Sequence, residues 1–317
     1  MATPFKLDPQ AQALLDLARQ RGAPTLSSQP PVQAREAYRN SRLPTQPQAP
    51  SAVVSRELSV AGPGGDVPVR EYRPTAAQPQ QVLPALVFFH GGGWVLGDRN
   101  THDVVCRMLC VQSACAVYSV DYRLAPEHRF PAAFDDACAA VVELINRATE
   151  LFIDPKRLAV GGDSAGGNLA TAAALALRGS NLPKLAAQLL VYPVTDMCAQ
   201  GGSYDDCATG YALSAADMHY FRDHYIDNPA HHTDWRASPL RAPSLAGLPP
   251  ALVLTAGYDP LRDEGRHYAD RLALEGVAVH HVCFERQMHG FLGMGGVIDE
   301  ANLAVRFCAD WLRHQLA

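Results

Sequence analysis

The stretch GGDSAGGNLA, residues 161–170, places a single hydroxyl group, that of Ser164, among four glycines. An apolar run precedes it, and an alanine- and leucine-rich run typical of a helix follows. The letters GDSAG match the pattern G-x-S-x-G, in which a nucleophile lies on a tight strand-to-helix turn. Gly162 and Gly166 are favoured there because larger side chains would collide with neighbouring structure. The pattern predicts that Ser164 is a nucleophile and that the Ala165 amide, at a helix N-terminus, can stabilise an anion.

Short apolar runs alternate with helical patterns on both sides of this turn. The run ALVFF at 85–89 is continuously apolar, which suits a strand buried on both faces of a sheet. This alternation predicts an α/β protein with a largely parallel, doubly wound sheet and right-handed crossovers. The expected strands are 53–60 and 66–74 in a hairpin, then 85–89, 116–122, 157–162, 186–193, 251–257 and 277–285. The expected helices are 102–114, 132–148, the stretch after Ser164, 262–276 and 299–316.

Two segments interrupt the alternation. Residues 1–50 contain two short helical patterns in a proline-rich context and are too short to bury a core of their own. Residues 197–248 contain no clear strand but include a predicted helix opened by Ser214 as its N-cap. We interpret 51–196 and 249–317 as the two parts of an α/β core, and 1–50 and 197–248 as a helical cap. The alternative is that 197–248 form a surface excursion without functional meaning.

The sequence HGGGW, residues 90–94, directly follows the predicted strand at 85–89. Consecutive glycines expose backbone N–H groups that a substrate oxygen can approach closely. Acyl transfer develops an oxyanion, and preorganised donors of this kind stabilise it. A plain glycine turn is the alternative, whereas a phosphate-binding loop is disfavoured because its Lys-Ser/Thr ending is missing.

A serine nucleophile needs a base, and twelve histidines compete for that role. His289 follows the last predicted strand and is expected on a loop at its carboxyl end. His280 and His281 lie within that strand and should face opposite sides of the sheet. The cluster HHTDW at 231–235 allows a metal site, but a solvated polar loop is the preferred interpretation.

An acid must orient the histidine, and Asp259 is the preferred candidate. It comes immediately after the predicted strand 251–257, where a rigid orienting group belongs. Asp263 and Glu264 lie one turn later and are disfavoured. The resulting order Ser164, Asp259, His289 is the chain order of α/β hydrolases, and it differs from the chymotrypsin and subtilisin orders.

Composition argues against several other classes of protein. The 317 residues carry a formal net charge of −5 without a block of like charge, so a nucleic-acid partner is not expected. No apolar run approaches the roughly 20 residues of a membrane helix, and no secretory signal is recognisable, so we expect a cytoplasmic protein. Of the eight cysteines, Cys106, Cys110 and Cys115 are closest together. We interpret them as core side chains, with a metal site as the alternative.

The chain resembles the hormone-sensitive-lipase-like esterases, also called bacterial family IV. The resemblance rests on HGGGW, DYRLAPEHRFPAAFDD, GDSAGGNLA, YDPLRDEG and MHGF, which occur in the family's order and cover nearly the whole chain. It implies an α/β-hydrolase core under a mainly helical cap. It also implies carboxylesterase activity on short- to medium-chain esters of small molecules, without metal or organic cofactor. Relatives suggest a homodimer.

The resemblance also implies site roles, residue by residue. It makes Ser164 the nucleophile, His289 the base and Asp259 its partner. The oxyanion donors would be the amides of Gly92, Gly93 and Ala165. The supporting or substrate-binding positions would be His90, Gly91, Trp94, Asp163 and Glu127, and the role of Asp163 is left open between a structural and a catalytic contact.

Two rival functions use the same scaffold. An amidase, peptidase or deacetylase would need the same three residues, so the sequence does not separate ester from amide substrates. A ligand-binding receptor, like the plant gibberellin receptors that resemble this family, would lack the histidine that is present here as His289. Natural substrate and acyl-chain preference depend on pocket shape, which the sequence does not give.

Overall fold

A single mixed β-sheet organises the computed structural model, which describes residues 5–317. Its strands lie in the order β1-β2-β4-β3-β5-β6-β7-β8. The hairpin of β1 and β2 joins β4 antiparallel, and all pairings from β4 to β8 are parallel. The predicted α/β class with its mostly parallel sheet is therefore confirmed. The strands are β1 (Val53–Gly62), β2 (Gly65–Pro74), β3 (Leu83–Phe89), β4 (Ala116–Val120), β5 (Ile153–Asp163), β6 (Ala187–Val191), β7 (Ala251–Tyr258) and β8 (Val279–Met288).

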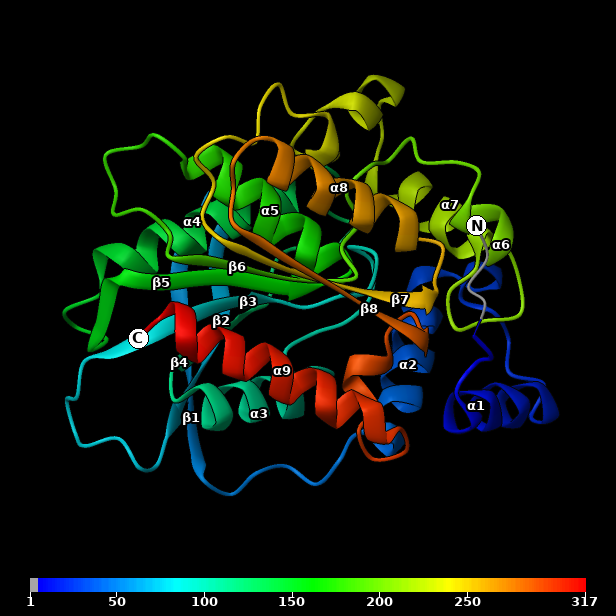
Figure 1. Cartoon of the computed structure of the whole chain (residues 1–317), viewed down its shortest axis with the longest axis horizontal. Coiled ribbons are helices and arrows are strands. Elements are labelled where there is room, and N and C mark those ends of the chain that lie inside the picture. Colours follow the sequence, from blue (N-terminus) through cyan, green and yellow to red (C-terminus); the bar gives the residue numbers. More distant parts are fainter. Residues whose placement is uncertain (1–4) are drawn as a thin grey trace.

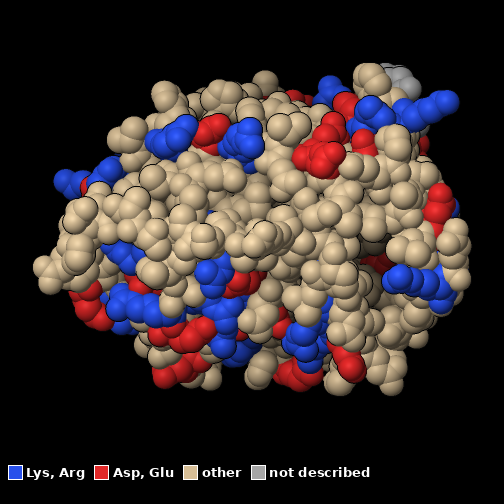
Figure 2. All heavy atoms as spheres, turned by 90° about the horizontal axis from the view of Figure 1, so that it is seen from below, with Lys and Arg blue, Asp and Glu red and all other residues tan. Residues whose placement is uncertain are grey.

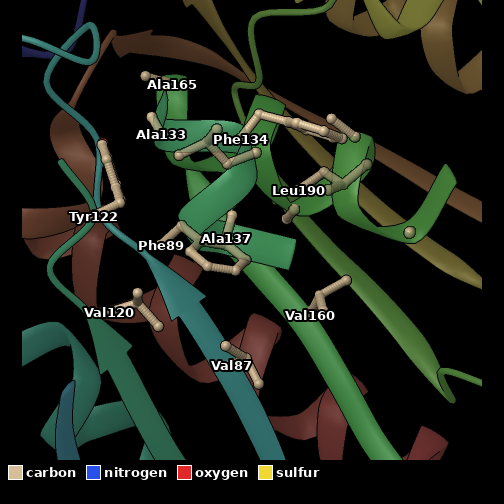
Figure 3. Close-up of a cluster of buried hydrophobic side chains, with 14 of the residues drawn as sticks. Val87, Phe89, Val120, Tyr122, Ala133, Phe134, Ala137, Val160, Ala165 and Leu190 are labelled. Atoms are coloured by element: carbon tan, nitrogen blue, oxygen red, sulfur yellow. The ribbon is translucent and has the colours of Figure 1, made fainter. Parts of the chain in front are cut away.

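Helices cover both faces of the sheet (Figure 1). On one face lie α4 (Ala132–Asn146), α5 (Ala165–Leu177) and α8 (Arg262–Leu274), and on the other lie α3 (Asp103–Ser113) and α9 (Asp299–Gln315). Side chains alternate along each strand, so β3 contributes Val87 and Phe89 to one core and Leu86 and Phe88 to the other. Figure 3 shows the first of these cores, which includes Phe89 and Val160 of the sheet and Phe134 and Ala137 of α4.

Four further helices gather at the end of the sheet where β7 and β8 finish (Figure 1). They are α1 (Pro9–Gln20), α2 (Pro31–Arg42), α6 (Ser203–Asp206) and α7 (Ala215–Tyr225). Short 3₁₀ turns occur at Leu26–Ser28, Leu43–Thr45, Pro229–Thr233 and Pro239–Arg241. A fifth such turn, Phe291–Gly293, follows β8. The first two helices come from the N-terminal segment and the other two from the 197–248 segment. The division into core and cap stays a prediction.

The start of α7 follows directly from its sequence. The Ser214 side chain accepts a hydrogen bond from the Asp217 amide at 3.1 Å, and Asp217 accepts one from the Ser214 amide at 3.0 Å. This reciprocal capping satisfies backbone donors that the first helical turn leaves unpaired. The predicted N-cap is therefore confirmed.

Charged side chains of both signs occur on one face of the molecule (Figure 2). On the face seen from below in the view of Figure 1, acidic and basic side chains are interspersed (Figure 2). Within residues 5–317 no helix is both long enough and apolar enough to cross a membrane.

Candidate active site

Ser164 lies on a strained turn between β5 and α5. Its φ is +57°, a value that is rare for residues other than glycine, and its side chain is nearly buried. Its amide donates to the Val191 carbonyl at 2.8 Å. A Cβ atom added to Gly162 would lie 2.4 Å from the Phe89 carbonyl oxygen, and one added to Gly166 would lie 1.9 Å from it. The two glycines of the motif therefore allow β5, the turn and α5 to pack directly against the end of β3.

The structure brings His289 and Asp259 to this serine. His289 Nε2 is 2.9 Å from Ser164 Oγ, and His289 Nδ1 is 2.7 Å from Asp259 Oδ2. Asp259 is completely buried, and its other oxygen accepts the Leu261 amide at 2.8 Å. Asp259 follows β7 and His289 follows β8, so the parallel strands deliver all three groups to one edge of the sheet.

The competing acids and histidines are engaged elsewhere. Asp263 pairs with Arg262 and accepts the Ser203 amide at 2.8 Å. Glu264 accepts the Thr195 amide at 2.6 Å and the Tyr204 hydroxyl at 3.0 Å. His231 faces Asp227 at 3.4 Å in an exposed turn. His280 and His281 contact Trp311 and Thr255, respectively.

The cysteines and the acidic and histidine side chains do not gather into a candidate metal site in the described part of the chain. No cluster of three metal-ligating side chains occurs within residues 5–317. All eight cysteines are free, and Cys106, Cys110 and Cys115 are buried.

The glycine loop after β3 passes close to the nucleophile turn. Gly92, Gly93 and Trp94 all have positive φ, at +124°, +60° and +59°. In the described part of the chain, the N–H groups of Gly92 and Gly93 donate to no protein acceptor. Ala165 is the first residue of α5, so its N–H has no partner within that helix. These three backbone N–H groups are therefore without a hydrogen-bond acceptor in the described part of the chain.

α7 covers the outer side of this loop. The position that a Cβ of Gly93 would take lies 2.2 Å from Cγ of Phe221. Trp94 is fully buried and stacks on Tyr225, with ring centroids 4.4 Å apart. The segment 197–248 therefore contacts the glycine loop directly.

Asp163 connects the nucleophile turn to the glycine loop. It accepts the Gly91 amide at 2.9 Å, and its Oδ1 lies 3.1 Å from His102 Nε2. Burial alone would raise the pKa of Asp163, but the facing charges of His102 and Arg42 and the Gly91 amide hold that pKa below its usual value. An ionised Asp163 thus fastens two segments that are far apart in the sequence.

His90 completes the inner side of the loop. Its ring stacks on Tyr122, with centroids 4.4 Å apart, and the Tyr122 hydroxyl donates to the His90 carbonyl at 2.7 Å. Burial and the neighbouring His102 lower the pKa of His90. A neutral imidazole is the expected form of His90, in a packing role beneath the glycines.

Glu127 lies on the surface and contacts the loop only through another side chain. It forms a two-pronged ion pair with Arg35 of α2, at 2.9 and 2.6 Å. Arg35 also donates to the carbonyls of Val95 and Ala125, each at 2.8 Å. The Arg35 hydrogen bond lowers the pKa of Glu127 to about 2.

Sequence reasoning missed His102, Arg35 and Arg42. Arg42 donates to the carbonyl of Gly290, the residue after His289, at 2.7 Å. His102 reaches Asp163 from the start of α3. No local pattern marks these three residues, because each acts on a segment at least 60 residues away.

Comparisons with known proteins agree with this architecture. A family model described as "alpha/beta hydrolase fold" matches residues 86–293. Carboxylic ester hydrolase LipN of Mycobacterium tuberculosis is 42% identical over 91% of this chain and 77% of its own. Ethyl acetate hydrolase of Pseudomonas putida is 40% identical over 80% of each chain.

Solved structures resemble the whole chain. A thermostable esterase from Pseudomonas putida superimposes with a TM-score of 0.94 at 35% identity, covering 100% of this chain and 99% of the other. An ester hydrolase from the metagenome of Lake Arreo, in complex with a derivative of bipyridine phosphonate, superimposes with a TM-score of 0.93 at 41% identity. The match covers 97% of this chain and 98% of the other. The chain therefore belongs to the α/β-hydrolase family, in its hormone-sensitive-lipase-like branch of carboxylic ester hydrolases.

Proposed function

We propose that this carboxylic ester hydrolase is a serine carboxylesterase that forms an acyl-enzyme on Ser164. The observation that carries the proposal is the hydrogen-bonded chain from Ser164 through His289 to Asp259, with distances of 2.9 and 2.7 Å. A serine hydroxyl is a weak nucleophile, and a base oriented by a buried carboxylate is what activates it. The relatives named carboxylic ester hydrolase and ethyl acetate hydrolase support an ester substrate.

In the proposed reaction, His289 Nε2 takes the proton of Ser164 Oγ as this oxygen attacks the ester carbonyl carbon. Asp259 stays ionised and accepts a hydrogen bond from Nδ1–H of His289, which fixes the tautomer and stabilises the imidazolium. The tetrahedral intermediate then expels the alcohol, which receives its proton from His289. Water, deprotonated by His289, attacks the acyl-enzyme and releases the carboxylic acid.

The proposed oxyanion donors are the amides of Gly92, Gly93 and Ala165. Two of them belong to the glycine loop and the third to the N-terminus of α5, where the helix dipole favours negative charge. Asp163 acts on these donors indirectly, because its bond to the Gly91 amide fixes the loop. We assign His90, Gly91, Trp94 and Glu127 to supporting the same loop.

We further infer that residues 1–50 and 197–248 form a cap over an α/β core made of 51–196 and 249–317. The contacts of Phe221 with Gly93 and of Tyr225 with Trp94 support this division, because they place the 197–248 segment against the proposed site. A cap in this position limits the space for the acyl group, and we propose short- to medium-chain esters as substrates. Rates on p-nitrophenyl acetate, butyrate, octanoate and laurate test this: kcat/KM should fall towards laurate.

The principal test is Ser164→Ala. We expect a folded protein whose kcat on p-nitrophenyl butyrate falls by about 10⁴-fold or more, because the nucleophile is gone. A fluorophosphonate probe should label the parent protein and not the variant. Ser119→Ala is the matched control, because Ser119 is a buried serine on β4 outside the proposed site. Retention of the parent rate by Ser164→Ala would refute the proposal.

A second measurement distinguishes an esterase from an amidase. Matched aryl esters and anilides of the same acid should be compared with one enzyme preparation. We expect hydrolysis of the ester to exceed that of the anilide by far, in line with the names of the relatives. The opposite order would assign the same residues to an amidase.

A further inference from the structure

Arg42, the last residue of α2, reaches from the N-terminal segment to the loop that follows His289. Its Nη1 donates to the Gly290 carbonyl at 2.7 Å, across 248 positions of sequence. Its guanidinium also stacks over the ring of Tyr38, one turn earlier on α2, at 5.0 Å from the ring centroid. Tyr38 is buried, so the arginine is held from its own helix.

The loop is shaped for this contact. Gly290 has φ of +77°, and a Cβ added to it would lie only 2.5 Å from Nη2 of Arg42. Any other residue at this position would have to displace the guanidinium and would also pay for the left-handed backbone. The close approach of Arg42 to the backbone next to His289 therefore depends on a glycine.

The sheet constrains the loop after His289 on one side only. β8 is the edge strand, and it pairs only with β7, with Met288 opposite Tyr258. His289 comes directly after the last pairing of an edge strand, where backbone constraint is weak. The bond from Arg42 supplies a constraint that the sheet does not provide.

Arg42 also faces the nucleophile turn. It lines one narrow cavity together with His102, Asp163, Tyr192 and Gly290. Its positive charge is one of the causes that hold the pKa of Asp163 below its usual value, after the opposing effect of burial and the charge of His102. One side chain of α2 thus acts on the backbone beside the base and on the carboxylate beside the nucleophile.

We propose that Arg42 is a positioning residue for ester hydrolysis: through the Gly290 carbonyl it holds the His289 imidazole in line with Ser164. This inference rests on the proposed function. Arg42 does not touch the reacting atoms. It acts by restricting the backbone from which the base projects, and a misplacement of about 1 Å can cost about 100-fold in rate.

The test is Arg42→Met, which keeps an apolar stem and removes every donor. We expect kcat on p-nitrophenyl butyrate to fall about 10- to 100-fold while KM changes little, because alignment rather than substrate binding is lost. The rate of Ser164 labelling by a fluorophosphonate should fall in parallel. Arg42→Lys should recover part of both rates, since an ammonium group can still donate to the carbonyl.

Arg39→Met is the matched control. Arg39 lies on the same helix but is exposed, and it pairs with the partly buried Asp98 at 2.7 Å. Rates should be measured well below the melting temperature of every variant. A merely structural role would lower the melting temperature of Arg42→Met and leave kcat and the labelling rate at parent values, and that outcome overturns the proposal.

Two further outcomes of these experiments also decide whether Arg42 positions His289. Where Arg42→Met does not fold, Arg42→Lys and Arg39→Lys are compared, and equal kcat values for the two would overturn the proposal. The failure of the proposed function has a different signature, because Ser164→Ala would then remain active. Loss of activity in Ser164→Ala with parent kcat in Arg42→Met refutes the positioning role alone.

Discussion

Two buried carboxyl groups near the proposed site have pKa values shifted in opposite directions. Asp163 faces His102 and Arg42, and its pKa lies below the usual value despite burial. Glu264 on α8 is equally enclosed, and burial raises its pKa to about 7. Its hydrogen-bond partners, the Thr195 and Asp196 amides and the Tyr204 hydroxyl, are uncharged, and the charge of Arg222 beyond Tyr204 offsets only part of the effect of burial. The charges that a carboxyl group faces, more than its depth, decide its ionisation.

Glu264→Gln should change how stability depends on pH. Because the pKa of Glu264 in the folded protein is above that of an unfolded chain, the folded protein binds the proton more tightly between about pH 4.5 and 7. Its contribution to the free energy of unfolding is therefore present below this window and is lost as pH rises through it. Urea unfolding measures the free energy of unfolding at pH 5 and pH 8. The decrease in this free energy between the two pH values should be smaller for the variant than for the parent, by on the order of 1 kcal/mol.

Glu36→Gln, on the exposed side of α2, is the control for this measurement. Parallel pH dependence for the parent and Glu264→Gln would show that Glu264 keeps its ordinary ionisation in the folded protein.

At the scale of elements, α7 and the glycine loop form one packed unit. Phe221 and Tyr225 contact Gly93 and Trp94, while Arg222 between them donates to the Tyr204 hydroxyl of α6. Tyr204 in turn donates to Glu264. A helix of the 197–248 segment is thus fixed both to the proposed oxyanion donors and to α8.

Gly93→Ala should impair catalysis without unfolding the protein. The new Cβ would lie 2.2 Å from Phe221 Cγ, and the φ of +60° is strained for alanine. Displacement of the Gly93 amide should lower kcat by about 100-fold or more, since one oxyanion donor is lost. Steady-state kinetics on p-nitrophenyl butyrate measure this effect.

Gly179→Ala is the control that separates the backbone strain of a positive φ from the steric clash with Phe221. Gly179 has φ of +80° and open space around it, so its variant pays the backbone cost alone, about 1–3 kcal/mol of stability, and should keep the parent kcat. The double variant Gly93→Ala with Phe221→Ala should regain part of the activity. Parent-like kcat in Gly93→Ala alone would remove this amide from the proposed site.

At the scale of the whole molecule, the two N-terminal helices are attached differently. The one buried residue of α1 is Ala11. The start of the helix makes polar contacts near the surface, from Asp8 to Arg286 and from Gln10 to Asp299. α2 buries Ala34 and Tyr38 and sends Arg35 and Arg42 to the loops of the proposed site. The loss of α2 should therefore matter far more than the loss of α1.

Two shortened chains test this difference. A chain lacking residues 1–24 should keep kcat/KM within a few-fold of the parent value, because the contacts of α1 are peripheral. A chain lacking residues 1–42 should lose at least about 100-fold, because both arginine contacts disappear. Esterase assays with thermal unfolding as the folding control check both. Equal losses in the two chains would contradict the proposed role of α2.

The alternation of elements and the five motifs predicted the α/β class, the strands and core helices, and the residues that the structure brings together at Ser164, but not α6 or the 3₁₀ turns. The spatial order of the strands was not predictable, since nothing local tells β4 to lie between β2 and β3. The role of Asp163 was left open for a similar reason. Its partners Gly91 and His102 lie 72 and 61 positions away, and their own neighbourhoods give no sign of the contact.

Features that depend on a few adjacent residues follow from the amino-acid sequence alone: the turn at Ser164, which needs Gly162 and Gly166, and the capped start of α7. These features are local because sterics and hydrogen bonds within one turn fix them. The contact of α2 with the loop after His289, made by Arg42 across 248 positions, depends instead on the packing of the whole chain. Such a contact exists because packing brings two distant segments together, and neither segment carries a pattern that requires the other.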